Sequence, residues 1–146
     1  MDNLQISNMT LDDFYKIENI YNSHFDTFWQ PINLKSELEN INSQYIVAKL
    51  NSEIVGFAGI WYSVDDAHIT NIVVRKDFRE HGIGCKLLEN LIKLAKEHKK
   101  TSLTLEVNVK NTIAQKLYLK YGFENLGIRK KYYKGVEDAY IMTLYF

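Results

Sequence analysis

Apolar residues recur along the chain with two different periods, and the switch between them predicts the secondary structure. Strict alternation and short apolar runs indicate strands, whereas recurrence at every third and fourth residue indicates helices. The resulting order is βααβββαβαββ. The expected strands cover residues 4–8, 44–50, 54–62, 68–75, 103–107, 123–133 and 140–144, and the expected helices cover 10–21, 34–40, 83–96 and 111–121.

Local signals support several of these boundaries. Thr10 has the side chain of a helix N-cap, and Asp13 follows in the first turn, where carboxylates interact favourably with the helix dipole. Asn51-Ser52 is a tight turn between two strands, and Gly122 is placed as a C-cap glycine. Strand–helix–strand units combined with a hairpin meander predict a mixed sheet with helices on both faces. Residues 1–146 contain no linker or repeat, so we expect a single domain.

Composition narrows the class of protein. Apolar residues make up 46% of the chain and charged residues 25%, which is typical of a globular domain. No apolar run has the roughly 18 residues of a membrane span, and the first ten residues do not resemble a signal peptide. A net charge of zero argues against nucleic acid as the partner.

Cysteine and histidine content adds two expectations. Cys85 is the sole cysteine, so an intrachain disulfide is excluded, as suits a cytoplasmic protein. His24, His68, His81 and His98 have no metal-ligand spacing, so we expect no metal.

A glycine loop between an apolar strand and an amphipathic helix is the first candidate for chemistry. Gly82 and Gly84 lie where the helix begins, and Arg79 and Lys86 add positive charge. Backbone N–H groups at a helix N-terminus bind anions, and glycine lets the backbone approach a ligand closely. The same two glycines also suit a simple tight turn. The loop lacks the G-x-x-x-x-G-K-[ST] pattern of a P-loop and the third glycine of a dinucleotide fingerprint.

Two further residues are candidates for proton transfer. Glu106 lies in an apolar strand, and alternation places it on the face opposite Leu105 and Val107. A carboxylate in such a setting is a candidate general base, although an exposed sheet glutamate gives the same pattern. Tyr118, on the next helix, is either a proton donor or a core aromatic. Asn111 has a structural role as the N-cap of that helix.

These segments together resemble the GNAT superfamily of N-acetyltransferases. R-E-H-G-I-G is similar to the family motif [QR]-x-x-G-x-[GA], and L-E-V, N-x-x-A and L-Y-x-x-x-G-F also recur. G-I-R-K-K-Y-Y and E-D-A-Y-I-M resemble the tail of one branch, the bacterial ribosomal-protein alanine N-acetyltransferases. The resemblance covers essentially the whole chain. One departure is Lys76, where the family often has a proline that only shapes a turn.

The resemblance implies the GNAT fold, an α/β (mixed α+β) domain with a central, mostly antiparallel sheet of about seven strands flanked by about four helices. It also implies acetyl-CoA as co-substrate, with Glu106 as general base and Tyr118 as general acid. The cofactor-binding residues it implies are Ile72, Val73 and Val74 for the pantetheine arm, Arg79, Glu80, His81, Gly82, Ile83, Gly84 and Cys85 for the pyrophosphate, and Asn111 near the thiol.

The acceptor implied by the tail is a protein N-terminus, such as that of a ribosomal protein. The substrate-binding residues expected for it are Phe28, Trp29, Arg129, Tyr132 and Tyr133. The alternatives are a small amine, a lysine side chain, or an acetyl-CoA-binding module without turnover. We expect a monomer or weak homodimer with no nucleic-acid or membrane partner. Whether Cys85 is reactive stays open.

Overall fold

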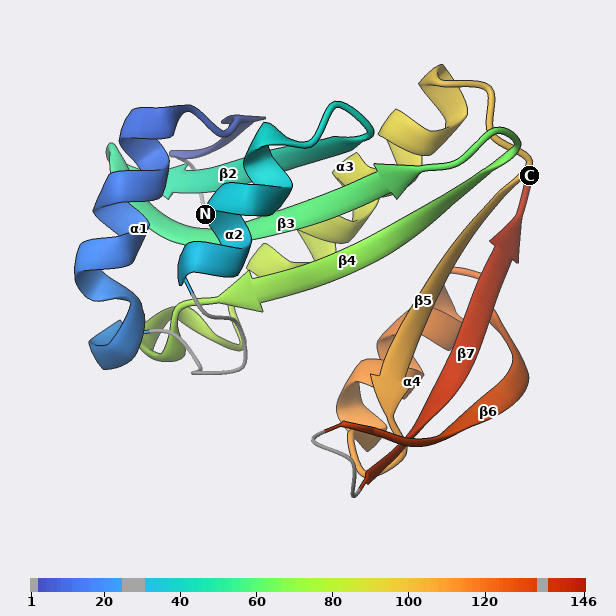
Figure 1. Ribbon diagram of the computed structural model, residues 1–146. Helices are drawn as coiled ribbons and strands as arrows, with labels where there is room; N and C mark the ends of the chain where they lie inside the picture. Colours follow the sequence, from blue (N-terminus) through green and yellow to red (C-terminus); the bar gives the residue numbers. More distant parts are fainter. Residues whose placement is uncertain (1–2, 25–30, 134–136) are drawn as a thin grey trace. The chain divides into compact units, whose positions relative to one another are not determined.

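The computed structural model describes residues 3–24, 31–133 and 137–146, and its elements follow the expected order (Figure 1). The strands are β1 (Leu4–Asn8), β2 (Ser43–Leu50), β3 (Glu53–Tyr62), β4 (Asp66–Val74), β5 (Ser102–Asn108), β6 (Glu124–Tyr133) and β7 (Glu137–Tyr145). The helices are α1 (Leu11–His24), α2 (Pro31–Glu39), α3 (Ile83–Glu97) and α4 (Thr112–Lys120), with a short 3-10 helix η1 (Lys76–Phe78).

Several boundaries differ from the sequence-based expectation, and one short element was not expected. α2 begins at Pro31 and not at Leu34, because proline is favoured in the first helical position, where its missing N–H is not needed. β4 begins at Asp66, two residues earlier than expected. η1 was not predicted, since a single 3-10 turn has no periodicity to detect.

The seven strands are hydrogen-bonded in the order β1-β2-β3-β4-β5-β7-β6. β1–β2, β2–β3, β5–β7 and β6–β7 are antiparallel, and β4–β5 is parallel. The mixed, mostly antiparallel sheet expected from the sequence is therefore confirmed.

The chain forms two compact units. The first unit comprises Met1–Trp61 and Thr70–Lys93, and the second comprises Tyr62–Ile69 and Leu94–Phe146. β4 and α3 each contribute residues to both units.

In the first unit, helices cover both faces of the strands (Figure 1). One core joins Phe14 of α1 and Leu34 of α2 to Phe57 of β3, and all three side chains are fully buried. The neighbouring residue Gly56 points to the other face, where a Cβ would lie 3.2 Å from Leu87 of α3. The strands are thus sandwiched between α1 and α2 on one face and α3 on the other.

A capping box fixes the start of α1. The hydroxyl of Thr10 accepts a hydrogen bond from the backbone N–H of Asp13 at 3.1 Å, and the Asp13 carboxylate accepts one from the N–H of Thr10 at 3.0 Å. Lys49 of β2 pairs with the same carboxylate at 2.8 Å. The Asp13 side chain is only 3% exposed, so α1 is tied to β2 by a buried charge.

In the second unit, β5 alternates between buried and partly exposed residues. Leu103, Leu105 and Val107 are buried, whereas the side chains between them lie on the opposite face. α4 is joined to the end of β5 by Gln115, whose side-chain amide donates hydrogen bonds to the carbonyls of Asn108 and Val109. The predicted orientation of Glu106, opposite Leu105 and Val107, is confirmed.

Membrane-spanning helices and clusters of metal ligands are both absent from the described ranges. No helix there combines the length and the apolar character needed to cross a bilayer. In the same ranges, no group of three or more His, Cys, Asp or Glu side chains is arranged to hold a metal ion.

Candidate active site

The glycine loop joins β4 to α3 in the first unit. Gly82 has a φ of +80°, in the left-handed region that glycine adopts without steric cost, and Glu80 has a φ of 66°. Lys86 donates the first backbone hydrogen bond of the helix, to the carbonyl of Gly82. The amides from Gly82 to Cys85 therefore have no acceptor within the helix and carry its partial positive charge.

Open space lies beside the two glycines of the loop. A Cβ built on Gly82 would meet nothing within 4 Å, and one built on Gly84 would meet only a methyl group of Val74, at 3.8 Å. A surface hollow of about 450 Å³ adjoins the loop, and its lining includes Gly82 and the ammonium-bearing Lys86. The first turn of α3 contains no acidic residue to neutralise its dipole. The loop is therefore accessible and suited to an anion.

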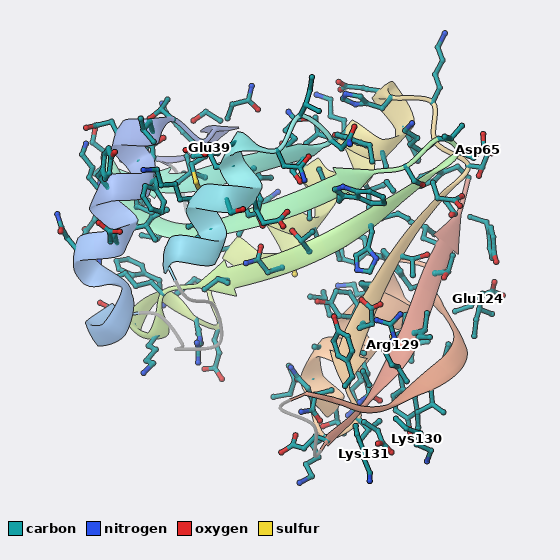
Figure 2. All side chains as sticks on the ribbon, viewed as in Figure 1. Glu39, Asp65, Glu124, Arg129, Lys130 and Lys131 are labelled. Carbon is teal, nitrogen blue, oxygen red and sulfur yellow. The ribbon has the colours of Figure 1, made fainter. Side chains whose placement is uncertain are left out.

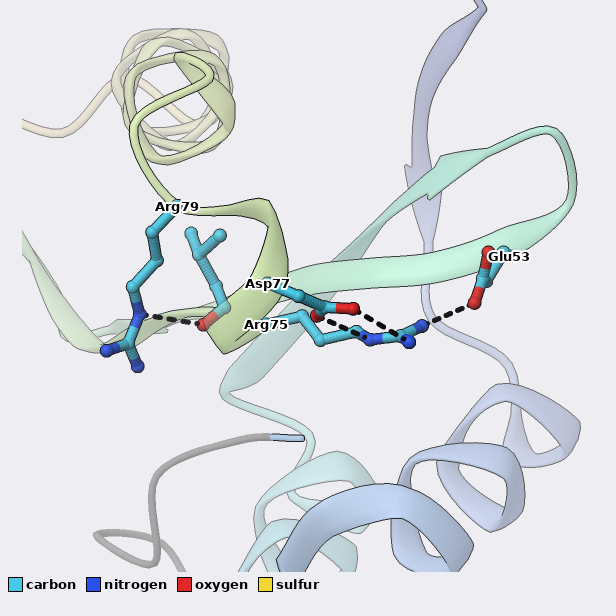
Figure 3. A network of polar contacts seen from close by, with 5 residues as sticks. Glu53, Arg75, Asp77 and Arg79 are labelled. Atoms are coloured by element: carbon cyan, nitrogen blue, oxygen red, sulfur yellow. Dashed lines mark hydrogen bonds and ion pairs between the residues drawn. The ribbon is translucent and has the colours of Figure 1, made fainter. Parts of the chain in front are cut away.

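Two arginines make polar contacts around the end of β4, just before the loop (Figure 3). The Nε of Arg79 donates a hydrogen bond to the carbonyl oxygen of Val74 at 3.3 Å, which folds this side chain back over β4. Arg75 pairs with Asp77 at 3.0 Å and also with Glu53 of β3. Although burial opposes its charge, these two carboxylates raise the pKa of Arg75. The turn after β4 is thus held by fixed charge pairs.

Glu106 is the centre of a polar cluster in the second unit. Its side chain is 7% exposed, and its Oε2 lies 2.7 Å from the Nε2 of His68. Its Oε1 lies 3.4 Å from an amino nitrogen of Arg129. The guanidinium of Arg129 in turn lies over the ring of Tyr132, 5.0 Å from its centroid. A nearly buried carboxylate is thus compensated by two nitrogen groups.

An irregularity in β6 brings Arg129 and Tyr132 together. Strict alternation would place residues three apart on opposite faces. Here the register shifts between Arg129 and Tyr133, Lys131 has a φ of 52°, and its N–H donates to the Asp138 carboxylate at 2.8 Å. That backbone hydrogen bond lowers the pKa of Asp138. In Figure 2 Arg129 lies over the strands of the second unit, whereas Lys130 and Lys131 extend outward from β6.

α4 carries the two remaining candidates. Asn111 caps the helix, its Oδ1 accepting a hydrogen bond from the N–H of Ala114 at 3.1 Å, which confirms the cap read from the sequence. The ring of Tyr118 packs against Phe123, 5.7 Å between centroids. Burial raises the pKa of Tyr118 to about 12, so its phenol keeps its proton throughout the neutral range.

Comparison with known proteins identifies the family. Residues 10–123 match the model of the Acetyltransferase (GNAT) family. The chain belongs to this family of acetyltransferases. A Bacillus subtilis (strain 168) protein, provisionally named a [ribosomal protein bS18]-alanine N-acetyltransferase, is 39% identical over 94% of this chain and 92% of its own length.

Solved structures agree with this assignment. The crystal structure of the ribosomal-protein-S18-alanine N-acetyltransferase from Escherichia coli superposes with a TM-score of 0.88 and 30% identity, covering 97% of this chain and 93% of that one. A GNAT acetyltransferase from Elizabethkingia anophelis, solved with acetyl-CoA bound, has a TM-score of 0.81 and 26% identity over the full length of both chains. The predicted GNAT fold and acetyltransferase class are confirmed.

The structure brings together only some of the predicted site residues. Glu106, Arg129 and Tyr132 form one cluster. Phe28 and Trp29 lie outside the described residues, and the side chain of Tyr133 is likewise not described.

Two residues of this acetyltransferase were missed by sequence reasoning. His68 was noted only as lacking metal-ligand spacing, yet it contacts Glu106 directly. Asn71 of β4 is 7% exposed, and neither atom of its side-chain amide has a hydrogen-bond partner among the described residues. A polar residue within the apolar run of β4 was the signal available for Asn71.

Proposed function

We propose that this acetyltransferase moves the acetyl group of acetyl-CoA to the α-amino group of a protein N-terminus, in the manner of a ribosomal-protein alanine N-acetyltransferase. The observation that carries the proposal is the nearly buried Glu106 carboxylate held by His68 and Arg129. Relatives named for acetylation of ribosomal protein bS18 at alanine support the acceptor class.

Features of the first unit fit acetyl-CoA. The open amides from Gly82 to Cys85 suit its pyrophosphate, and the unpartnered amide of Asn71 offers hydrogen bonds beside Ile72. The binding set we propose within the first unit is Ile72, Val73, Val74, Arg79, Glu80, His81, Gly82, Ile83, Gly84 and Cys85. The role of Asn111, which belongs to the second unit, stays a prediction from the family resemblance. Acetyl-CoA supplies the acetyl group in an activated form, as a thioester.

The acceptor amine must lose a proton before it attacks. An α-amino group with a pKa near 8 is about one-tenth neutral at pH 7, whereas a lysine with a pKa near 10.4 is neutral in only a few molecules per ten thousand. A carboxylate base is therefore sufficient for an α-amine. We assign this role to Glu106, which accepts the proton at a carboxylate oxygen.

Tyr118 acts on the leaving group of the reaction, the thiolate of CoA. With a pKa of about 12, its phenol is a weaker acid than a thiol, whose pKa is near 8.5, so complete proton transfer to the departing thiolate is uphill by roughly 5 kcal/mol. A hydrogen bond from the phenol to the sulfur has no such cost and still stabilises the developing negative charge. We therefore assign to Tyr118 the donation of this hydrogen bond.

A peptide panel tests the acceptor. The wild type is incubated with acetyl-CoA and peptides beginning with Ala, Ser or Met, together with an N-terminally blocked peptide that contains an internal lysine, and the acetylated atom is located by mass spectrometry. We expect acetylation of free N-termini, with Ala preferred. Acetylation confined to the internal lysine, or to small amines such as polyamines, would contradict the proposal.

Two variants test the chemistry. Glu106→Gln and Tyr118→Phe are expected to lower kcat by about 100-fold or more, with acetyl-CoA binding within threefold of the wild type. The control is Glu124→Gln, an exposed position at the start of β6, which should leave both parameters unchanged. Near-normal kcat in both test variants would refute the assignment.

A further inference from the structure

His68 connects the buried Glu106 to the protein surface. The Glu106 side chain is 7% exposed, whereas the His68 side chain is 34% exposed, and 2.7 Å separates their nearest atoms. A base that is shielded from water must still release each proton that it accepts before it can act again. The contact with His68 offers a route for that proton.

The contact follows from strand register. β4 and β5 are parallel, and His68 is paired with Thr104. Glu106 lies two residues farther along β5 and therefore on the same face. A diagonal pair of this kind has long side chains within reach of one another. The geometry is thus fixed by the backbone of two adjacent strands.

Neither of the other two described side chains in the cluster can accept the proton. Arg129 is permanently protonated and has no acceptor atom, so it can hold the carboxylate but cannot deprotonate it. Burial and the charge of Glu106 raise the pKa of Tyr132, which therefore keeps its own proton at neutral pH. An imidazole in its neutral form has one unprotonated nitrogen, which can accept a proton, and His68 supplies this group to the cluster.

We propose that His68 is a proton-relay residue that takes the acceptor amine's proton from Glu106 and passes it to solvent. The inference rests on the assignment of Glu106 as base under Proposed function. The amine N–H bond breaks as a Glu106 O–H bond forms. Before the transfer, Nε2–H of the neutral imidazole donates a hydrogen bond to the Glu106 carboxylate. After the transfer, water takes the Nε2 proton and returns one to Nδ1, so that Nε2 faces the new Glu106 O–H group with a free electron pair. The O–H bond then breaks as Nε2 gains that proton, and Nδ1 loses one proton to water. Nε2–H again faces the Glu106 carboxylate, as at the start of the cycle, and one proton has moved from amine to solvent.

Two substitutions separate relay from positioning. In His68→Gln the side-chain amide can still donate a hydrogen bond to Glu106, but it cannot carry a proton. In His68→Ala a space is left that a small base from solution can enter. We expect both variants to lose about 10- to 100-fold in kcat on the peptide acetylated best by the wild type, with KM for acetyl-CoA within twofold. Added imidazole should restore part of the kcat of His68→Ala, in proportion to its neutral form.

Two control variants complete the experiment. His98→Gln changes another histidine of the second unit, whose ring stacks on Tyr62 and lies outside the cluster, and should keep wild-type kcat. Glu106→Gln should not respond to imidazole, because the group that feeds the relay is missing. Wild-type kcat in His68→Gln, or a low kcat in His68→Ala that imidazole does not raise, would overturn the relay.

A wrong acceptor assignment would give a different result from a wrong assignment of the relay. If the wild type acetylates only internal lysine, the proposed acceptor is wrong, and the His68 comparison is made on the lysine peptide with the same expected losses and rescue. A wild type that acetylates none of the acceptors overturns both proposals. Far-ultraviolet circular dichroism and the melting temperature of each variant establish that a loss of kcat is not a loss of fold.

Discussion

Gly59 lies beneath a buried tyrosine, and its replacement by alanine is a sharp test of how the first unit is packed. A Cβ at this position would lie 2.3 Å from Cζ of Tyr45 and 2.4 Å from the hydroxyl oxygen of Thr70. Both distances are far below van der Waals contact. Tyr45 is only 2% exposed, and its hydroxyl shares a 3.0 Å hydrogen bond with that of Thr70, so the ring has no free space into which to move.

The cost of Gly59→Ala can be built from its parts. Overpacking a filled core costs about 1–3 kcal/mol, and breaking the Tyr45–Thr70 hydrogen bond adds about 1 kcal/mol. The reduced entropy of the unfolded chain returns roughly 0.5 kcal/mol. We therefore expect a loss of about 1.5–3.5 kcal/mol in the free energy of unfolding, which corresponds to a melting temperature lower by roughly 3–14 °C for a chain of this size.

Urea unfolding followed by circular dichroism measures this loss, and Gly127→Ala provides the matched control. Gly127 is also a strand glycine, but the nearest atom to its Cβ position is a methyl carbon of Ile141 at 3.8 Å, an ordinary contact. The control should therefore unfold within about 0.5 kcal/mol of the wild type. Tyr45→Phe isolates the hydrogen bond and should lose about 1 kcal/mol. Equal stability of Gly59→Ala and Gly127→Ala would falsify the packing argument.

Two predictions concern pH. Burial opposes ionisation of Asp13, but hydrogen bonds from Lys49 and Thr10 outweigh it and place the pKa of Asp13 below its usual 3.8. This stabilisation is present above pH 3.8 and is lost as the pH falls through the folded-state pKa. Asp13→Asn should therefore destabilise the protein by about 1–2 kcal/mol at pH 7 and progressively less in acid. Urea titrations at several pH values measure this difference in the free energy of unfolding. A difference from the wild type that does not shrink in acid would contradict the charge argument. Burial raises the pKa of Tyr118 from 10 to about 12. The contribution of its protonated phenol to the free energy of unfolding is fully present below pH 10. That contribution falls by roughly 3 kcal/mol as the pH rises toward 12. Tyr118→Phe should flatten that part of the decline, and an unchanged alkaline slope would show that the phenol is not buried.

Local signals in the sequence were sufficient for the elements and their caps. The capping box at Thr10, the cap at Asn111 and the turn at Asn51 depend on residues close together in the chain, so their chemistry can be read directly. The orientation of Glu106 followed from alternation alone. The start of α2 was placed too late, because its apolar periodicity begins after Pro31.

Contacts between strands could not be predicted in this way. Glu106 meets His68 because β4 and β5 pair with His68 opposite Thr104, and no local pattern specifies that register. Both residues can be seen in the sequence. The sequence does not show that Glu106 lies two residues beyond Thr104, the residue paired with His68. A one-residue change in register would place His68 on the other face.

The same reasoning explains why Arg129 and Glu106 could both be named from the sequence while the contact between them could not. It was expected to bind substrate, yet its guanidinium lies 3.4 Å from the base that the family pattern assigns to catalysis. The positive φ of Lys131 is the cause of the arrangement around it, because the irregularity there turns Tyr132 to the face of Arg129. Lysine does not favour a positive φ, so the residues around Lys131 in the sequence do not predict the irregularity. The Asp138 carboxylate that accepts the Lys131 N–H lies on the neighbouring strand and stabilises the irregularity. The environment of Glu106 is therefore set partly by a hydrogen bond from a backbone N–H of β6 to the Asp138 side chain of β7.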